Sequence, residues 1–354
     1  MEEILNETQK TVTKESCAMS AILPTMRTRT LFLAAVVIAA AFLPATGKTA
    51  EYQPPTPSQQ VATVEYAWHD AARERDVPVK IYYPAKGKGP FPMIIFSHGL
   101  GGSREGYEYL GRYWAGCGYV SVHLQHHGSD DAVWRDAASI PEAAEAMKDA
   151  VADVSNAINR AKDVSFAIDE LTKLNKETDF PLHGELDLAE IGMSGHSFGG
   201  WTTTAMAGED FGPGKPSLGD PRVKAAVAMS APVPPLADRK GAFEKITIPI
   251  FYMTGTLDNS PLGETTAAER RILFEGTNHA ETCLVIFNGA DHMTFSGHLI
   301  PRASDAPFQR LICIASTAFW DAYLRGDGAA KDWLYNGGFA KLLGDQGTFE
   351  KKLP

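Results

Sequence analysis

The chain has 354 residues, 44% of them hydrophobic, so it can bury a large core and is not expected to be disordered. Its formal net charge of −10 argues against nucleic acid and phospholipid headgroups as partners, because both carry negative charge. Residues 1–47 hold four acidic and four basic residues, so the net charge belongs to the part of the chain that follows them. The composition therefore favours an acidic globular protein.

Residues 1–47 are predicted to form a leader that carries an export signal. From Met26, the basic stretch MRTRT leads into thirteen apolar residues, Leu31–Leu43, and then into the small-residue stretch PATGK. This order is typical of a signal peptide, with cleavage after Gly47. The apolar run is shorter than the roughly 18–20 residues that span a bilayer, and a retained signal-anchor is the alternative. We therefore expect translation to start at Met26, with Met19 as the alternative, and the protein to be exported, to the periplasm or outside the cell, without a stable membrane span.

After the leader, residues 48–60 are proline-rich and predict a linker, and residues 61–354 predict a single domain. Its expected elements are strands at 61–68, 77–83 and 91–99, a helix at 104–118, a strand at 119–124, a helix at 154–171, a strand at 189–193, a helix at 198–208, strands at 223–229 and 248–255, a helix at 269–276, a strand at 282–289 and a helix at 308–324. Apolar strands that alternate with helices predict an α/β fold, a mostly parallel twisted sheet with helices on both faces. The first two strands predict an antiparallel N-terminal hairpin.

The stretch SGHSFGG, residues 194–200, lies where a predicted strand gives way to a predicted helix. A serine hydroxyl is a poor nucleophile unless it is held exposed and a base accepts its proton. Gly-x-Ser-x-Gly between strand and helix provides the exposure, because the sharp turn raises the serine above the sheet and the glycines relieve crowding. A turn that needs glycine only for close packing is the alternative. We predict that Ser197 is a nucleophile flanked by Gly195 and Gly199.

An acyl-transfer serine also needs N–H donors for the negative oxygen that develops during attack. The stretch FSHGLGG, residues 96–102, follows the third predicted strand, and its glycines leave backbone N–H groups able to point at a ligand. The N–H of Phe198, the residue after the nucleophile, would be the other donor. An ordinary strand exit at His98 and Gly99 is the alternative. We expect residues 96–102 to form part of an oxyanion hole.

The acid and the base are expected later in the chain, in the order Ser, Asp, His. Asp258 follows one apolar strand, in MTGTLDNSP, and His292 follows the last one, in FNGADHMTF. The carboxyl ends of parallel strands meet at the edge of the sheet where Ser197 is expected. We therefore predict that His292 deprotonates Ser197 and that Asp258 orients the imidazole. His298 is the competing base, and Asp291 is a less suitable acid because neighbours in a loop rarely face each other.

Two segments are candidates for shaping a substrate pocket, residues 125–143 and 209–222, since no long insertion could form a large lid. The stretch HLQHHGSDDAVW, residues 123–134, holds histidines and aspartates that could bind a metal, but adjacent His126 and His127 suit two ligands badly. We predict a substrate-binding role for His126, with a polar rim as the alternative, and expect neither a metal nor another cofactor. The candidates for apolar walls, each of which could instead be a core residue, are Trp134, Trp201 and Phe295.

Three of the four cysteines follow the leader. Cys117 lies in the apolar stretch WAGCGYVSV, where a buried thiol is expected. Cys283 falls on a predicted strand and Cys313 on a predicted helix, and the two could pair in an oxidising compartment. The sequence leaves this disulfide open. It contains no cysteine spacing typical of a zinc site.

These residues in this order resemble the α/β-hydrolase superfamily over residues 61–324. FSHGLGG and GHSFGG together are most similar to the platelet-activating-factor acetylhydrolase and dienelactone-hydrolase-like branch. The resemblance implies that the oxyanion donors are the backbone N–H groups of Leu100 and Phe198. The sequence departs from the acetylhydrolases at the acid, because VAMSAPVPP offers no carboxylate before Asp238. Asp258 matches the position used by the dienelactone-like and most other members, although dienelactone hydrolases have a cysteine nucleophile.

Together these features predict an exported serine hydrolase that cleaves carboxylic esters of small molecules through an acyl-enzyme. A serine peptidase or amidase of the same fold is one alternative. A non-catalytic binding protein of this fold is the other, and it is disfavoured because all three catalytic positions are filled in order.

Overall fold

The structure is a computed structural model and describes residues 52–234, 239–297 and 302–354. The predicted leader lies outside these residues, as do the alternative acid Asp238 and the competing base His298. The described chain forms a nine-stranded sheet. In sheet order the strands are β1 (Val61–Asp70), β2 (Arg75–Pro84), β4 (Val120–Leu124), β3 (Phe91–Ser97), β5 (Leu186–His196), β6 (Val223–Met229), β7 (Ile250–Leu257), β8 (Thr282–Asp291) and β9 (Gly347–Lys352).

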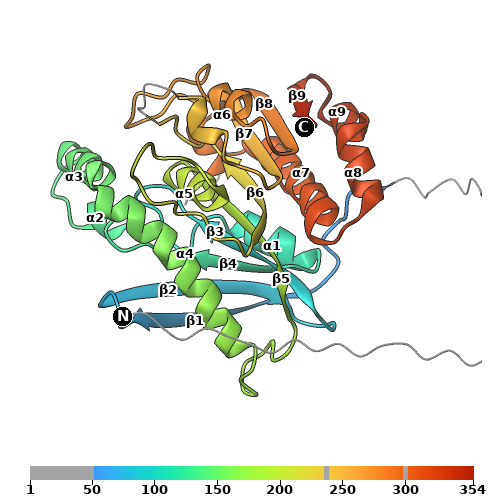
Figure 1. Cartoon of the computed structure of the whole chain (residues 1–354), viewed down its shortest axis with the longest axis horizontal. Coiled ribbons are helices and arrows are strands. Elements are labelled where there is room, and N and C mark those ends of the chain that lie inside the picture. Colours follow the sequence, from blue (N-terminus) through green and yellow to red (C-terminus); the bar gives the residue numbers. More distant parts are fainter. Residues whose placement is uncertain (1–51, 235–238, 298–301) are drawn as a thin grey trace, which may run out of the picture. The chain divides into compact units, whose positions relative to one another are not determined.

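The sheet is mostly parallel, as predicted. Strands β4, β3, β5, β6, β7 and β8 pair parallel with one another in that order, and the predicted hairpin β1–β2 adds an antiparallel edge beside β4. Strand β9, which the sequence did not predict, pairs antiparallel with β8 and closes the other edge. Figure 1 shows the N-terminal hairpin in blue and the C-terminal elements in red at opposite ends of the sheet. This architecture is that of an α/β-hydrolase fold.

The central strands are apolar without alternation because both of their faces are covered. In β3, Ile94 and Phe96 belong to one buried cluster and Met93 and Ile95 to another on the opposite face. Helices α1 and α7 to α9 contribute to the first cluster, whereas α4, α5 and α6 pack on the other face. The helices are α1 (Glu108–Gly116), α2 (Ala132–Arg135), α3 (Ile140–Ala152), α4 (Val154–Leu174), α5 (Phe198–Ala207), α6 (Arg271–Gly276), α7 (Ala306–Leu324), α8 (Gly328–Tyr335) and α9 (Gly338–Leu343). Among the described residues, no helix is both long and apolar enough to cross a membrane.

Helices α2 and α3 occupy a segment that the sequence predicts only as a polar connection. Helix α3 begins after Ser139, whose side chain accepts a hydrogen bond from the Glu142 N–H, and it has a proline in its first turn. Only Ala150 of this helix is buried, and Ile140 is 87% exposed. The weak apolar face explains why periodicity did not reveal the helix.

Residues 52–60, predicted as a linker, contact the domain at several points. The backbone N–H groups of Ser58 and Gln59 donate to the Gly116 carbonyl at the end of α1. The Tyr52 hydroxyl donates to the Asp321 carboxylate on α7, at 2.7 Å.

The cysteines among the described residues, Cys117, Cys283 and Cys313, are free thiols. Cys283 on β8 and Cys313 on α7 are both buried and unpaired, so the disulfide left open by the sequence is not formed. Burial raises the pKa of Cys283 to about 12, which keeps this thiol protonated.

Candidate active site

Ser197 lies at the junction between β5 and α5, as predicted. Its φ of 56° is rare for a residue with a side chain, and its N–H donates to the Met229 carbonyl at the end of the neighbouring strand β6. Backbone strain of this kind is maintained only where the surroundings fix it. The turn holds the Ser197 side chain, which is only partly buried, at the carboxyl end of the sheet.

The two flanking glycines are required by close backbone contacts. A Cβ atom on Gly199 would lie 1.8 Å from the Ser97 carbonyl oxygen, and one on Gly195 would lie 2.3 Å from the Gly199 carbonyl oxygen. Both distances are far inside van der Waals contact. Close backbone packing is thus the direct reason for the glycines. This packing allows the sharp turn at Ser197 to form.

The three predicted side chains form one hydrogen-bonded line, here called the pocket line: Ser197, His292 and Asp258. His292 Nε2 lies 2.9 Å from Ser197 Oγ, and His292 Nδ1 lies 2.7 Å from Asp258 Oδ1. Because Nδ1 faces a carboxylate, it carries the proton and donates it to Asp258, which leaves Nε2 to accept from the serine hydroxyl. Asp258 is fully buried and His292 is 6% exposed.

Asp258 is held from its other side by a buried arginine that the sequence did not single out. Arg270 Nε lies 3.0 Å from Asp258 Oδ2, and the Thr254 hydroxyl donates to the same oxygen at 2.7 Å. Arg270 also donates to the carbonyls of Ser230 and Ala231 beyond β6. Desolvation lowers the pKa of Arg270, and the Asp258 carboxylate opposes that effect. Nothing in the stretch ERRILFEG distinguishes Arg270 from Arg271, so sequence reasoning had no signal for it.

The neighbouring carboxylate, Asp291, points elsewhere. It caps the short helix at His292–Phe295 by accepting from the Thr294 N–H, and it pairs with Arg302 at 2.7 Å. The ion pair and hydrogen bonds with Arg302 lower the pKa of Asp291. This agrees with the prediction that Asp291 is a poor partner for the histidine beside it.

Ser197 and His292 open into a pocket of about 640 Å³. Residues 98–102 of the segment predicted to form the oxyanion hole, here called the oxyanion loop, line it through Gly99 to Gly102, and residues 260–263 line it from the loop after β7. The apolar side chains that the pocket presents include Leu100, Trp134, Met147, Val151, Leu262 and Met293. Met147 and Val151 come from helix α3, which therefore forms part of the wall. The predicted segment 125–143 contributes to this lining, but residues 209–222 do not occur in its described part.

The two residues whose N–H groups are the predicted oxyanion donors line the same pocket as Ser197. Leu100 lines the pocket from the oxyanion loop, and Phe198 lines it as the first residue of α5. The N–H of a first helical residue has no intrahelical acceptor, so that of Phe198 is available to a ligand. The loop itself is fixed at Gly101, whose N–H donates to the Ser129 carbonyl at 2.9 Å.

The predicted substrate-binding residues divide into two groups. Trp134 lines the pocket, and its indole N–H donates to the Gly101 carbonyl at 2.7 Å. The described part of the lining does not contain the other three. Phe295 is fully buried against the His196 ring, Trp201 contacts Phe198 and Phe211 on the side of α5, and His126 is fully buried.

The other histidines and aspartates of residues 123–131 take part in internal contacts. His123 is buried and bonded to the Ser121 hydroxyl, and His127 pairs with Asp130 at 3.1 Å. Burial lowers the pKa of His123 to about 3. Within the described parts of the chain, no group of three or more potential ligands is arranged to hold a metal ion.

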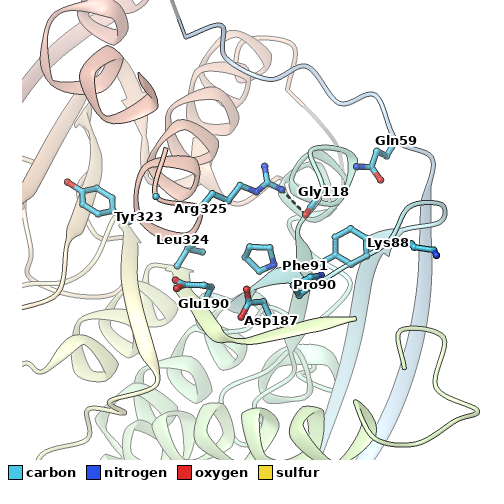
Figure 2. A pocket seen from close by; sticks show the side chains of 12 residues that line it. Gln59, Lys88, Pro90, Phe91, Gly118, Asp187, Glu190, Tyr323, Leu324 and Arg325 are labelled. Carbon is cyan, nitrogen blue, oxygen red and sulfur yellow. Dashed lines mark hydrogen bonds between the residues drawn. The ribbon is translucent and has the colours of Figure 1, made fainter. Parts of the chain in front are cut away.

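A second pocket, shown in Figure 2, lies at the amino ends of β3 and β5. Ser197 follows the carboxyl end of β5. Pro90, Phe91 and Asp187 line it at the starts of these strands, and Arg325 follows helix α7. The Arg325 guanidinium donates to the Gly118 carbonyl at 2.8 Å, which the dashed line in Figure 2 marks. The side chains that line this second pocket are mostly charged or polar, in contrast to those of the pocket at Ser197.

The comparisons with known proteins match part of the chain. Residues 56–148 match the family model described as platelet-activating factor acetylhydrolase, isoform II, a stretch that contains the oxyanion loop and ends before Ser197. Proteins named platelet-activating factor acetylhydrolase are similar to the chain at 25% identity in Cavia porcellus, 26% in Canis lupus familiaris and 24% in Bos taurus. These alignments cover 46–50% of this chain and 39–43% of the relatives, so the match spans less than half of their length. The resemblance predicted from the sequence is thereby confirmed.

Proposed function

We propose that the protein is a serine hydrolase that cleaves carboxylic esters of small molecules. The observation that carries the proposal is the pocket line, a continuous Ser–His–Asp series of hydrogen bonds whose serine opens into an apolar pocket. The similarity to proteins named acetylhydrolases favours acetyl and other short acyl esters as substrates. No cofactor takes part in the proposed chemistry.

In the proposed reaction, Ser197 Oγ attacks the ester carbonyl while His292 Nε2 accepts the hydroxyl proton. The imidazolium that forms is stabilised by the Asp258 carboxylate, which lies 2.7 Å from Nδ1. His292 then gives the proton to the leaving alcohol, and an acyl-enzyme on Ser197 remains. Water attacks the acyl-enzyme with the same histidine as the base, which releases the acid and restores Ser197.

The negative oxygen formed in each attack is proposed to lie between the backbone N–H groups of Leu100 and Phe198. Fixed donors in a site that excludes most water stabilise developing charge without reorganisation during the reaction. Losing one such donor typically costs about 10²–10³ in rate, so these groups would supply a large part of catalysis.

Pocket shape suggests which part of the ester binds where. The apolar surface formed by Leu100, Trp134 and Leu262 would accept an acyl or alkyl group. Each methylene group buried there would contribute roughly 0.8 kcal/mol to the free energy of binding. The described lining holds two carboxylates, Glu105 and Asp131, and no lysine or arginine, so an anionic substrate would find no permanent positive charge there. We also propose that the protein acts after export through its predicted signal, at the periplasm or outside the cell.

The proposal is tested by hydrolysis of a p-nitrophenyl ester series, from acetate to palmitate, with the chain and its Ser197→Ala variant. Turnover that is greatest for short acyl groups and absent from Ser197→Ala is the expected result. Thr203→Ala is a matched control. The Thr203 hydroxyl is buried within α5, and the hydrogen bond described for it is the one that it donates to the Gly199 carbonyl. Absence of turnover on every ester, together with turnover on amide substrates, would favour the peptidase alternative instead.

A further inference from the structure

A second Ser–His–Asp line, here called the buried line, lies directly beneath the oxyanion loop: Ser97, His126 and Asp163. Ser97 Oγ lies 2.6 Å from His126 Nε2, and His126 Nδ1 lies 2.9 Å from Asp163 Oδ2. The ring therefore donates from Nδ1 to the carboxylate and accepts from the serine at Nε2, the same arrangement as in the pocket line. Ser97 ends β3 and immediately precedes the oxyanion loop.

The buried line has no access to a substrate. Ser97, His126 and Asp163 are each completely inaccessible to solvent at the level of the residue. None of the three occurs in the described lining of the pocket that Ser197 opens into. An ester could therefore not reach Ser97, and the line must act through its packing and hydrogen bonds.

The charged end of the buried line is held by two arginines. Arg75 Nε lies 2.9 Å and Arg73 Nη1 lies 2.7 Å from Asp163 Oδ1. Burial opposes ionisation of Asp163, but hydrogen bonds from His126 and Arg75 lower its pKa to about 2 overall. Burial also lowers the pKa of His126 to about 4, so the ring is neutral at ordinary pH. The network is a fixed arrangement of one carboxylate, one neutral imidazole and one hydroxyl.

Arg160 connects the buried line to the two segments that carry the predicted oxyanion donors, because its guanidinium donates to the Ser97 hydroxyl at 3.4 Å. Its guanidinium donates to the carbonyl of His98, which begins the oxyanion loop, and to the hydroxyls of Ser129 and Thr202 at 2.9 and 3.0 Å. The guanidinium carbon also lies 4.6 Å from the centre of the Phe198 ring. Arg160 is fully buried. A fully buried guanidinium is unfavourable unless its N–H groups are hydrogen-bonded. Here two of the acceptors, the His98 carbonyl and the Thr202 hydroxyl, belong to the oxyanion loop and to α5.

Further hydrogen bonds fix the loop to the same segment. The backbone N–H of His126 donates to His98 Nε2 at 3.1 Å, and that of Gly101 donates to the Ser129 carbonyl. Residues 126–129 thus hold the loop at both ends, and the buried line in turn holds His126. The four side chains that make up this support, here called the buried frame, are Ser97, His126, Arg160 and Asp163.

We propose that the buried frame positions the two oxyanion donors relative to Ser197. This inference rests on the proposed ester hydrolase and concerns how its oxyanion hole is kept in place. A donor displaced by about 1 Å can cost up to roughly 10²-fold in rate, so rigid support beneath the loop has a direct catalytic value. The four side chains are positioning residues and contact neither substrate nor reacting atoms.

The test compares Ser97→Ala with Ser121→Ala. Ser121 is an equally buried serine on the adjacent strand β4 and is also bonded to a histidine, His123, but that pair makes no described contact with residues 98–102. For each variant we measure kcat and KM on the best p-nitrophenyl ester and Ki for a trifluoromethyl ketone, which forms an oxyanion adduct with the serine. Thermal unfolding of each variant shows whether it is folded at the assay temperature.

Ser97→Ala is expected to lower kcat by about 30-fold and to raise the Ki of the ketone by a similar factor. KM is expected to change by no more than about two-fold. Ser121→Ala is expected to change none of these values by more than about two-fold. Equal kcat in Ser97→Ala and the unaltered protein would overturn the inference, as would equal losses in both serine variants. If Ser97→Ala does not fold, His126→Gln, which leaves Asp163 with both arginines, is judged by the same criteria. A kcat of Ser197→Ala within about ten-fold of the unaltered protein would instead overturn the proposed function, so the two failures are distinguishable.

Discussion

The pocket line and the buried line have the same three residue types and nearly the same spacing. Their serine–histidine distances are 2.9 and 2.6 Å, and their histidine–aspartate distances are 2.7 and 2.9 Å. They differ in where the serine lies. Ser197 occupies a strained turn at the mouth of a pocket, whereas Ser97 ends a buried extended strand. Hydrogen-bond geometry alone therefore does not distinguish Ser197 from Ser97.

The difference also shows what else the chemistry requires. Ser197 shares its pocket with Leu100 and Phe198, the residues of the two predicted N–H donors, while Ser97 is fully buried and accepts a hydrogen bond from Arg160. In the buried line the same three groups stabilise one conformation of the backbone. One arrangement is thus proposed to react and the other to support, and the predictions that follow separate these roles.

The largest expected effect is on Ser197. Replacing it by alanine should lower kcat by roughly 10⁶, because removal of the nucleophile of a Ser–His–Asp set leaves only the oxyanion hole and binding. Hydrolysis of p-nitrophenyl acetate, followed over long incubations for the variant, measures this loss. A kcat within a factor of ten or so of the unaltered protein would mean that the pocket line does not carry the reaction.

Asp258→Asn is expected to lower kcat by about 10⁴, since the amide would favour the wrong tautomer of His292. The amide retains the size of the carboxylate, so the side chains around it need not move. Asp291→Asn is the control, because Asp291 pairs with Arg302 and faces away from the imidazole. A greater loss in Asp291→Asn than in Asp258→Asn would assign the acid to the other carboxylate.

In the buried line, the corresponding change acts on stability. Asp163→Asn removes the charge that Arg73 and Arg75 share and should lower the free energy of unfolding by about 3 kcal/mol at pH 7. The pKa of Asp163 is lowered to about 2, so its contribution is present above the unfolded value of 3.8 and is lost as pH falls. Urea unfolding from pH 7 to 3 should show the deficit of the variant narrowing. A deficit that grows towards low pH would contradict this account.

Glu209 provides a buried carboxyl outside both lines. Desolvation raises its pKa from 4.5 to about 8, so folding favours the protonated form and stability falls as pH rises between these values. Glu209→Gln removes this dependence and should stabilise the protein by a few kcal/mol at most at pH 8.5, with little effect at pH 4.5. Urea midpoints at the two pH values measure it. Equal shifts at both pH values would show that Glu209 does not titrate as described.

Much of the fold could be predicted from the sequence because its signals are local. Continuous apolar strands such as β3 and β6 reveal a sheet buried on both faces, and the glycines around Ser197 mark the strand–helix turn. The order of Ser197, Asp258 and His292 followed from the positions of strand ends. These side chains do lie in one hydrogen-bonded line, and their proposed roles await the kinetic tests above.

The remaining parts of the site depend on contacts that no local pattern encodes. His126 lies at a strand end, but the sequence does not say whether a side chain there points into a pocket or beneath it. Its partners Ser97 and Asp163 are distant in the chain, on β3 and α4. The pocket wall on α3 was missed because Met147 and Val151 face the pocket from a helix that buries little else. Arg270 and Asp163 were missed for the same reason, because no local sequence pattern marks either residue or its partners.

The most direct test of the contrast between the two lines is covalent labelling with an alkyl fluorophosphonate, followed by peptide mass spectrometry. The reagent reacts with a serine that is both activated and accessible, and the peptides containing Ser97 and Ser197 are distinguished by mass. We expect the label on Ser197 in the unaltered protein and no label on either serine in Ser197→Ala. Label on Ser97, or labelling that persists unchanged in Ser197→Ala at another serine, would contradict the assignment of reaction to the pocket line and of support to the buried line.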